Sequence, residues 1–472
     1  MAELQEARSN RENEAIVSEE WSISSDDILQ VEDWLETDNQ EALQKVVDDY
    51  HYSAQADLIQ HLHNPEQRVK LAQFLTSYNQ YDFWSELDES VRSELAERIE
   101  TKDLATVVSE LDNDDAVAVL ENLDSEEERE AIIQELDAED RHAVRESFSW
   151  PEDSAGRMMA QDFIAFPSYM QVGDAIDWFR NESEKEEVTL PEKFFNIYLL
   201  DPLYKPIGQV ALSKLLQTRR NVELKEIAEE QLPTIEADMD QEDVAFLFKQ
   251  KDLVSAPVVD KRGCMIGEIT VDDVVDVIEE EHEEDFMALG GVMEEDLYER
   301  IRPTAKARIR WLLLNMVTAV FAAGVISLFS ETIETVVVLA ALMPIVASLG
   351  GNAGSQTLTV AVRALATREL ASTNAWRFIR KEGAVGLING IVLAIVGGMI
   401  TLLWQHDISL ALVIAAALIF NLMVASLAGA FIPLGLSRYG IDPAIASSVF
   451  LTAITDVIGF FVFLGFASIF LV

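Results

Sequence analysis

The sequence predicts a multidomain membrane protein with an all-α superhelical N domain, an α/β repeat pair, a long connecting helix and a five-helix transmembrane domain. Three observations predict it: charge is segregated along the chain, a strand pattern recurs after 59 residues, and five apolar stretches follow one another. We divide the chain into a mobile extension (1–25), the N domain (26–150), the repeat pair (151–280, as 151–220 and 221–280), a connecting helix (281–304) and the transmembrane domain (305–472).

The 472 residues carry a net charge of −48, and the charge is unevenly distributed. From Ala305 onward there are 7 acidic and 9 basic residues, so the preceding 304 residues hold 76 acids and only 26 bases. Such an acidic surface repels nucleic acid and attracts cations, so we expect no nucleic-acid partner. An acidic proteome in a salt-adapted organism is the alternative explanation.

The extension is polar and acidic, which is typical of neither a secretory signal nor a transit peptide, so we expect the acidic half to stay in the cytoplasm. Beyond it, Leu-Asp pairs begin successive helical segments. The aspartates of three pairs, Asp112, Asp124 and Asp137, are each followed three residues later by an acid. That pattern is typical of a helix N-cap and its partner. Their spacing predicts stacked helices of about ten residues.

After Arg157 the pattern changes to strands that alternate with helices. Leu-Leu-Asp201 and Ile-Gly208-Gln-Val recur 59 residues later as Val-Val-Asp260 and Ile-Gly267-Glu-Ile. This repeat resembles a tandem pair of CBS modules. The second copy contains a pattern similar to the ribose-binding groups of such modules, which makes Thr270 and Asp273 candidate nucleotide residues and ATP a candidate ligand. The first copy lacks both groups.

Residues 271–300 predict one helix rich in acids that leads directly into the first apolar stretch. A charged run of this kind is usually a solvated connector. Its position before the membrane favours a regulatory role instead.

Five apolar stretches, at about 309–330, 336–362, 384–404, 410–436 and 445–471, are each long enough to cross a bilayer. Lys and Arg cluster before the first stretch and in the 2–3 and 4–5 connections, whereas the 1–2 and 3–4 connections hold only acids. The positive-inside rule predicts a cytoplasmic N-terminus and an external C-terminus.

The second stretch contains Pro344 and the polar, glycine-rich run Gly350-Gly-Asn-Ala-Gly-Ser-Gln356. We expect these residues to break the helix, and irregular backbone is tolerated at membrane depth only beside protein or a water-filled path. Gly350, Gly351 and Gly354 would let a second backbone or an ion approach closely. A kink that serves helix packing is the alternative.

Asp456 is an acid within the fifth stretch, and we expect no other acid and no base inside a span. A carboxylate costs a few kcal/mol at mid-membrane, so it should face a pore or a partner. Thr452 lies on the same helical face. The sequence therefore predicts a cation site at Asp456, and a protonated Asp hydrogen-bonded to another span is the alternative.

These motifs, together with Arg363-Ala-Leu-Ala366, Asp442-Pro-Ala444 and Thr455-Asp456-Val-Ile-Gly459, resemble the MgtE family of magnesium channels over nearly the whole chain. The resemblance implies a homodimer in the bacterial plasma (inner) membrane, with a pore formed mainly by spans 2 and 5. It implies Mg²⁺ as both the transported and the regulatory ion. The residues before the pore aspartate, Ala446-Ser-Ser-Val-Phe450, depart from the family pattern.

Two sets of candidate residues follow from the resemblance. The ion path would be formed by Gly350, Gly351, Asn352, Thr452 and Asp456. The connecting helix would plug the pore. Regulatory Mg²⁺ would be bound by acids of the second CBS module, Asp273 and Asp276, and by acids of the connecting helix, Glu281, Glu284 and Asp285.

Three functions compete on this sequence. The first is a Mg²⁺-conducting channel closed by cytoplasmic Mg²⁺, and the second is a carrier of the same fold coupled to H⁺ or Na⁺. The third is a sensor that transports nothing, which would need neither the glycine-rich span nor the buried acid. The sequence shows no nucleophile, metal triad or phosphate loop, and its only cysteine is Cys264, so we expect no enzyme.

Overall fold

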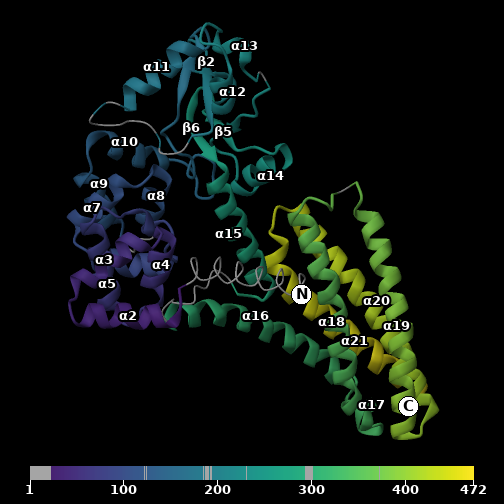
Figure 1. Ribbon diagram of the computed structural model, residues 1–472. Coiled ribbons are helices and arrows are strands. Elements are labelled where there is room, and N and C mark those ends of the chain that lie inside the picture. The colour runs from purple at the N-terminus through teal and green to yellow at the C-terminus, as the bar shows by residue number, and fades with distance from the viewer. Residues whose placement is uncertain are drawn as a thin grey trace, which may run out of the picture. The chain divides into compact units, whose positions relative to one another are not determined.

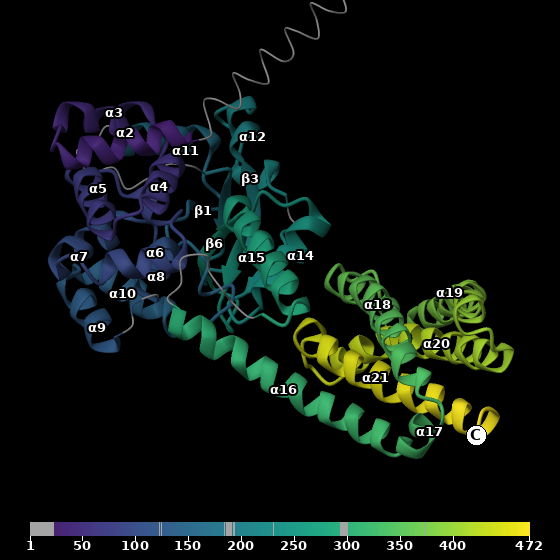
Figure 2. The ribbon, with the colours of Figure 1, turned by 90° about the horizontal axis from the view of Figure 1, so that it is seen from below.

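The computed structural model describes residues 23–472 except 122, 124, 184, 186–190, 192–193, 230, 293–300 and 372. Nearly all of the expected extension 1–25 therefore lies outside the described residues. The chain forms two compact units that divide between Glu279 and Glu280. Figures 1 and 2 show the elements of each unit from two directions.

The first unit begins with a stack of short helices, shown in purple and blue in Figure 1. Their bounds are α2 Ser25–Glu36, α3 Gln40–Asp49, α4 Tyr52–His61, α5 Pro65–Ser77, η1 Asp82–Trp84, α6 Glu89–Ala96, α7 Thr101–Glu110, α8 Asn113–Glu121, α9 Glu126–Glu135 and α10 Ala138–Ser147. The helices from α7 to α10 are 9 or 10 residues long, as the spacing predicts.

Side chains cap several of these helices. In α2, Ser24 and Asp27 form a reciprocal capping box. The predicted cap of α10 is confirmed, because the Asp140 amide donates to Asp137 Oδ1 at 3.0 Å. The cap of α9 is not the predicted Asp124, which lies outside the described residues. Ser125 caps that helix instead, and its Oγ accepts from the Glu128 amide.

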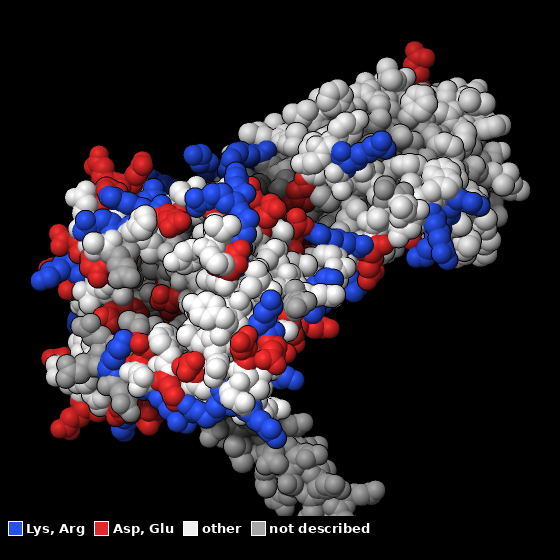
Figure 3. Space-filling model, turned by 90° about the horizontal axis from the view of Figure 1, so that it is seen from above, with Lys and Arg blue, Asp and Glu red and all other residues white. Residues whose placement is uncertain are grey.

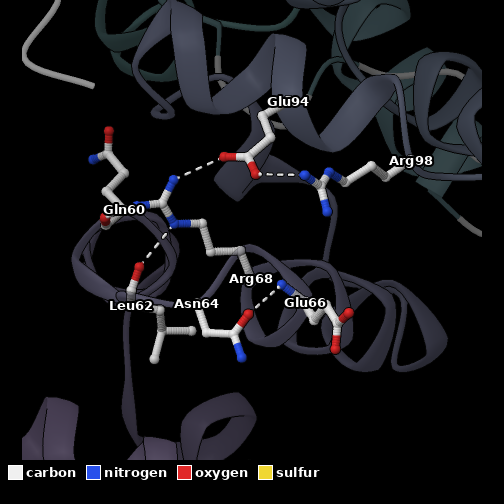
Figure 4. A network of polar contacts seen from close by, with 7 residues as sticks. All are labelled: Gln60, Leu62, Asn64, Glu66, Arg68, Glu94 and Arg98. Atoms are coloured by element: carbon white, nitrogen blue, oxygen red, sulfur yellow. Dashed lines mark hydrogen bonds and ion pairs between the residues drawn. The ribbon is translucent and has the colours of Figure 1, made fainter. Parts of the chain in front are cut away.

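An arginine joins three of these helices (Figure 4). Arg68 in α5 donates to Glu94 in α6 at 2.9 Å and to the Leu62 carbonyl at 2.8 Å, and Arg98 lies 3.3 Å from the other oxygen of Glu94. Arg68 and Glu94 are mostly buried. One side chain can bond both the carboxylate and the carbonyl because a guanidinium supplies several donors in a fixed geometry.

The rest of the first unit consists of two similar α/β modules. The first contains β1 Ala165–Pro167, α11 Val172–Ser183, β2 Asn196–Leu200, β3 Pro206–Ala211, α12 Leu212–Gln217 and α13 Leu224–Ile227. The second contains β4 Ile235–Glu236, α14 Gln241–Lys251, β5 Ser255–Val259, β6 Met265–Thr270 and α15 Val271–Leu289. In each sheet a parallel pair is followed by an antiparallel pair.

The registers confirm the 59-residue repeat. Leu199 pairs with Gly208 in the first sheet, and Val258 pairs with Gly267 in the second. The two modules are joined by buried polar side chains, as Asn196 donates to Ser255 at 2.9 Å. Tyr198 likewise donates to Glu268 at 2.7 Å. The modules therefore pack as a pair and not as separate domains.

The predicted helix over 271–300 is shorter than expected. Helix α15 ends at Leu289, and the backbone turns at Gly291, which has a φ of +72° that favours glycine. The amides of Gly291 and Val292 donate back to the Ala288 and Met287 carbonyls, as in a typical helix C-cap. Residues 293–300 lie outside the described part.

The second unit is helical: α16 Ile301–Ser327, α17 Ser330–Thr335, α18 Val338–Ala366, α19 Ala375–Gln405, α20 Ile408–Arg438 and α21 Pro443–Phe470. Five of the described helices are long and apolar enough to cross a membrane, as predicted. Figure 3 shows the contrast in charge, because Asp, Glu, Lys and Arg gather on the first unit while the membrane helices expose few of them.

Two expectations about the spans are wrong. Helix α18 is continuous through Pro344 and the glycines, so the span is not broken. The helix continues on both sides of Pro344, whose nitrogen has no hydrogen to donate, and Gly350 and Gly354 serve close packing instead. Asp456 is also not the only charged residue in a span, because α19 begins at Ala375 and contains the buried Glu382. The expected absence of bases is wrong as well, since the candidate spans include Arg363 and Lys381.

Candidate functional site

The crossing of α18, α20 and α21 is built on glycines. A β-carbon at Gly354 would lie 2.7 Å from Leu451 of α21, and one at Gly429 of α20 would lie 2.5 Å from the Gly354 carbonyl oxygen. Any side chain at these positions would push the helices apart. Gly354 therefore lets α18 approach both neighbours, which is the packing role that the sequence left open.

Gly350 and Gly459 both contact the amide of Asn421 in α20. A β-carbon at Gly350 would overlap Asn421 Nδ2, and one at Gly459 would lie 3.0 Å from Asn421 Oδ1. Asn421 Nδ2 donates to the Val346 carbonyl at 2.8 Å. The predicted residue Gly350 is thus buried against protein, and Asn421 is a polar residue that the sequence interpretation did not single out.

Asp456 is half-buried in α21 and forms no hydrogen bond or ion pair with any other residue that the structure describes. Thr452, one turn earlier, is exposed, and its hydroxyl donates to the Ser448 carbonyl of the same helix at 2.9 Å. The predicted alternative, a carboxyl group hydrogen-bonded to a neighbouring span, is therefore not observed within the described part of the chain.

Asn352 and Gly351 do not join this crossing. Asn352 is exposed, and a β-carbon at Gly351 would meet nothing within 4 Å. Most of the predicted ion-path residues therefore lie at the surface of one chain, because Asn352 and Thr452 are exposed and Asp456 is half-buried.

A second buried polar pair lies between α18 and α19. Thr357 donates to Glu382 at 3.1 Å, and both side chains are buried. Lys381 Nζ lies 3.4 Å from the other oxygen of Glu382. The apolar run in the sequence begins just after Glu382, which is why sequence reasoning placed this acid outside the span. A signal for it was the position of Glu382 within one helical turn of that run.

The first unit contains an acidic cluster, defined by the carboxylates of one electrostatic network: Glu86, Asp112, Asp114, Asp115, Asp272, Asp273 and Asp276. Its members come from the loop before α6, from α8 and the residue before it, and from the first turns of α15. The helical domain and the second α/β module therefore present like charges to each other.

The pKa values of this cluster are raised. The pKa of Asp115 is raised to about 7 and that of Asp273 to about 6, mainly by burial and in part by the charges of neighbouring carboxylates. Burial also raises the pKa of Asp114, with added effects of Asp115 and Asp273. Asp114 Oδ1 is buried and has no hydrogen-bond partner in the described chain. Arg92 is the base whose charge opposes the shift at Asp115.

Thr270 and Asp273, the candidate nucleotide residues, are hydrogen-bonded to each other. The Thr270 amide and hydroxyl each donate to Asp273 Oδ2 at 3.0 Å. This is the geometry of a capped helix N-terminus. Asp273 therefore takes part in three arrangements: a helix cap, the acidic cluster and the predicted nucleotide site.

Acids of α15 also approach the membrane helices within the second unit. Burial raises the pKa of Asp285 to about 6, and the charges of Asp442 and Glu281 add to the effect. Ala288 is buried against Leu358, Ala444 and Leu451 of the spans. The end of α15 thus packs beside α18 and α21, while Asp273 and Asp276 belong to the first unit. Among the described residues, no group of three or more His, Cys, Asp or Glu side chains is already arranged to hold a metal ion.

Comparison with known proteins identifies the family. Residues 343–466 match the MgtE model, described as a divalent cation transporter, residues 50–153 match the MgtE intracellular N domain, and residues 224–280 match the CBS domain. The magnesium transporter MgtE of Thermus thermophilus is 33% identical over 341 residues, which cover 71% of this chain and 74% of the relative. The chain belongs to the MgtE family.

Two further relatives are also MgtE proteins. The magnesium transporter MgtE of Bacillus subtilis is 26% identical, and the match covers 86% of this chain and 88% of the relative. The magnesium transporter MgtE of Enterococcus faecalis is 29% identical, and the match covers 71% of this chain and 73% of the relative. A solved structure of the cytosolic domain of the Mg²⁺ channel MgtE in complex with ATP is similar to 53% of this chain, with 99% of that chain covered, 25% identity and a TM-score of 0.49. The family membership confirms the predicted fold class.

Proposed function

We propose that this MgtE-family chain forms a homodimeric channel that takes up Mg²⁺ down its electrochemical gradient and is closed by cytoplasmic Mg²⁺. The observation that carries the proposal is Asp456, a carboxylate within a span that has no partner among the described residues. An unpaired intramembrane acid marks an ion pathway by default. The names of the three relatives, all magnesium transporters, support Mg²⁺ as the ion.

The surface position of the ion-path residues supports a dimer. Thr452 and Asn352 are exposed in a single chain, and polar groups facing lipid are costly. A second copy that covered this face would place two Asp456 carboxylates beside one path. Mg²⁺ sheds its waters reluctantly, so a pair of carboxylates can recognise the hydrated ion through its water shell and still release it.

The acidic cluster supports the gating part of the proposal. Its residues fit Mg²⁺, because carboxylate oxygens are the ligands that this ion prefers and the cluster disfavours their charge in the ion's absence. Asp273 and Asp276 would hold regulatory Mg²⁺ in the first unit, and Glu281, Glu284 and Asp285 would do so beside the spans. A bound cation would remove the repulsion between the carboxylates.

For gating, Mg²⁺ must bind the closed arrangement more tightly than the open one, since only a difference in affinity shifts an equilibrium. When cytoplasmic Mg²⁺ falls, the carboxylates repel one another and the closed arrangement loses its advantage. Several weak sites acting together would make the response steep. The same acids therefore sense the ion that the pore conducts.

Two finer points belong to the proposal. Basic residues before span 1, in the 2–3 connection and in the 4–5 connection support a cytoplasmic N-terminus and an external C-terminus. ATP is a candidate ligand of the second CBS module on its sequence motif alone. A nucleotide that used Thr270 and Asp273 would have to replace their mutual hydrogen bonds.

A coupled carrier is the second candidate, because one unpaired carboxylate could equally exchange H⁺ or Na⁺ for a divalent ion. The deciding experiment measures Mg²⁺ entry into proteoliposomes that contain the full chain or Asp456→Asn, without a pH or Na⁺ gradient. The proposal expects rapid entry that Asp456→Asn abolishes. Entry only under an imposed H⁺ or Na⁺ gradient would establish the carrier. Absence of entry in every condition, from a folded dimer, would leave the sensor.

A further inference from the structure

Asn421 lies in the middle of α20 and is completely buried. Its Nδ2 donates to the Val346 carbonyl of α18 at 2.8 Å, which also fixes the orientation of the amide because the opposite one would bring two oxygens together. A polar side chain at this depth has no water to bond with. Apolar packing alone therefore does not account for this side chain.

The two glycines that flank Asn421 belong to α18 and α21. A β-carbon at Gly350 would overlap Nδ2, and one at Gly459 would lie 3.0 Å from Oδ1. The amide thus fills the space between the two helices, and only glycine fits on either side of it. Three helices meet at one side chain.

The two ends of the amide differ. Nδ2 is hydrogen-bonded to α18, whereas Oδ1 is buried without a hydrogen-bond partner in the described chain. A buried polar atom without a partner costs free energy, so an apolar side chain would serve pure packing better. The amide is instead hydrogen-bonded to α18 and in van der Waals contact with α21.

We propose that Asn421 is a positioning residue that sets the separation of α18 and α21 at the level of Gly350 and Gly459. Asp456 lies one turn from Gly459 on α21, so this separation determines where its carboxylate stands relative to α18. The inference rests on the proposed function, in which those two helices form the ion path. Asn421 acts through the position of Asp456 and does not contact the ion.

The core around α20 supports this role. Three apolar residues of α20 near Asn421 are buried: Ala417, Leu418 and Leu422. Gly386 and Gly390 of α19 pack against the backbone of α20 at Leu422 and Ile419. A side chain on an element held this closely can fix a spacing, since functional geometry is most accurate on rigid elements.

The first test compares wild type with Asn421→Leu, a replacement with the same number and branching of side-chain heavy atoms that cannot hydrogen-bond. Initial rates of Mg²⁺ and Co²⁺ entry into proteoliposomes give an ion preference, and the melting temperature of the purified full chain reports folding. We expect the Co²⁺/Mg²⁺ ratio or the Mg²⁺ rate to change by up to about 100-fold, as when a functional group is displaced by about 1 Å, in protein that still melts cooperatively. Thr401→Val is the matched control, because Thr401 is equally buried and bonds only within its own helix.

The second test enlarges Gly350 and reduces Asn421, and it remains informative if Asn421→Leu does not fold. Gly350→Ala alone should lower both the melting temperature and the Mg²⁺ rate, and adding Asn421→Ser should restore much of both. Gly459→Ala should behave like Gly350→Ala. Gly465→Ala is the control on α21, because a β-carbon there meets nothing within 4 Å.

The outcomes separate the two proposals. Absence of flux in wild type would contradict the proposed function, whatever the variants do, and the second test could still be read from melting temperatures. Wild-type flux with an unchanged ion ratio and rate in Asn421→Leu would overturn the positioning role. The positioning role would also be overturned if Gly350→Ala and the double variant Gly350→Ala/Asn421→Ser were equally unstable.

Discussion

Asp114 of α8 and Asp273 of α15 lie within electrostatic reach of each other, although one belongs to the helical N domain and the other to the second CBS module. The charge of Asp273 helps to raise the pKa of Asp114, after the larger effect of burial. No hydrogen bond relieves Asp114 Oδ1 among the described residues. The folded protein thus holds two acids where ionisation of one disfavours ionisation of the other.

The pH dependence of stability follows from these shifts. The pKa of Asp115 is about 7 and that of Asp273 about 6, both above the value of 3.8 for a free aspartate, so the folded state binds protons more tightly than the unfolded state. Without divalent ions, stability should therefore fall as pH rises from about 4 to 7, by up to about 1.4 kcal/mol per pKa unit, and level off above. Melting temperatures of the full chain in EDTA would show the decline.

Asp115→Asn should flatten that decline, because it removes one titrating group and its repulsion of the others. Asp103→Asn is the control, since Asp103 is an exposed acid of α7. A melting temperature that rises with pH, or an equal slope in Asp115→Asn and wild type, would contradict the electrostatic description of the cluster.

Mg²⁺ should stabilise the protein most where the cluster is ionised. At pH 8, Mg²⁺ at 100 times its dissociation constant should add about 2.7 kcal/mol if it binds only the folded state at one site. Asp115→Asn and Asp273→Asn should lose much of this gain, while Asp103→Asn should keep it. Equal gains in all four proteins would place the stabilising ion elsewhere.

Asp285 should matter for gating. Its pKa is about 6, raised by burial first and then by Asp442 and Glu281, so its negative charge opposes the packing of α15 beside the spans. Asp285→Asn should weaken both this repulsion and its relief by Mg²⁺, so the ratio of flux at low and high cytoplasmic Mg²⁺ should shrink. The exposed Glu283 offers a control as Glu283→Gln. An undiminished ratio would remove Asp285 from the regulatory set.

The hydrogen bond between Thr357 and Glu382 should stabilise the helix bundle. Thr357→Val removes the donor and leaves a buried carboxylate oxygen less well satisfied, which typically costs about 1–3 kcal/mol. The melting temperature should fall, by about 2–4 °C per kcal/mol for a unit of this size. Thr357→Ser should retain the bond. Thr359→Val is the control, because Thr359 is exposed and bonds only to Ser355 of its own helix.

Local patterns in the sequence predicted much of the fold. The 59-residue offset predicted the strand pairs, because the pairs Leu199–Gly208 and Val258–Gly267 are each fixed by residues close together in the chain. Asp137 predicted a helix start because a cap bonds only to the next turn. The apolar runs predicted the spans because bilayer thickness fixes their length.

The sequence could not show which helices meet. The glycines around Gly350 predicted a broken span, but α18 is continuous, with Gly350 packed against Asn421 and Gly354 packed against Leu451. Asn421 itself is one amide within an apolar run, and its importance depends on neighbours from two other helices. Glu382 lay just outside the apolar run, and only the full length of α19 places it inside the helix.

The most direct test of the channel is an electrical recording from the full chain in a planar bilayer, with Mg²⁺ as the only permeant cation. We expect currents in wild type that reverse at the equilibrium potential of Mg²⁺ without a pH gradient. They should close when Mg²⁺ is raised on the side of the N-terminus, and Asp456→Asn should abolish them. A reversal potential that follows the H⁺ or Na⁺ gradient, or transport without current, would contradict a Mg²⁺-conducting pore.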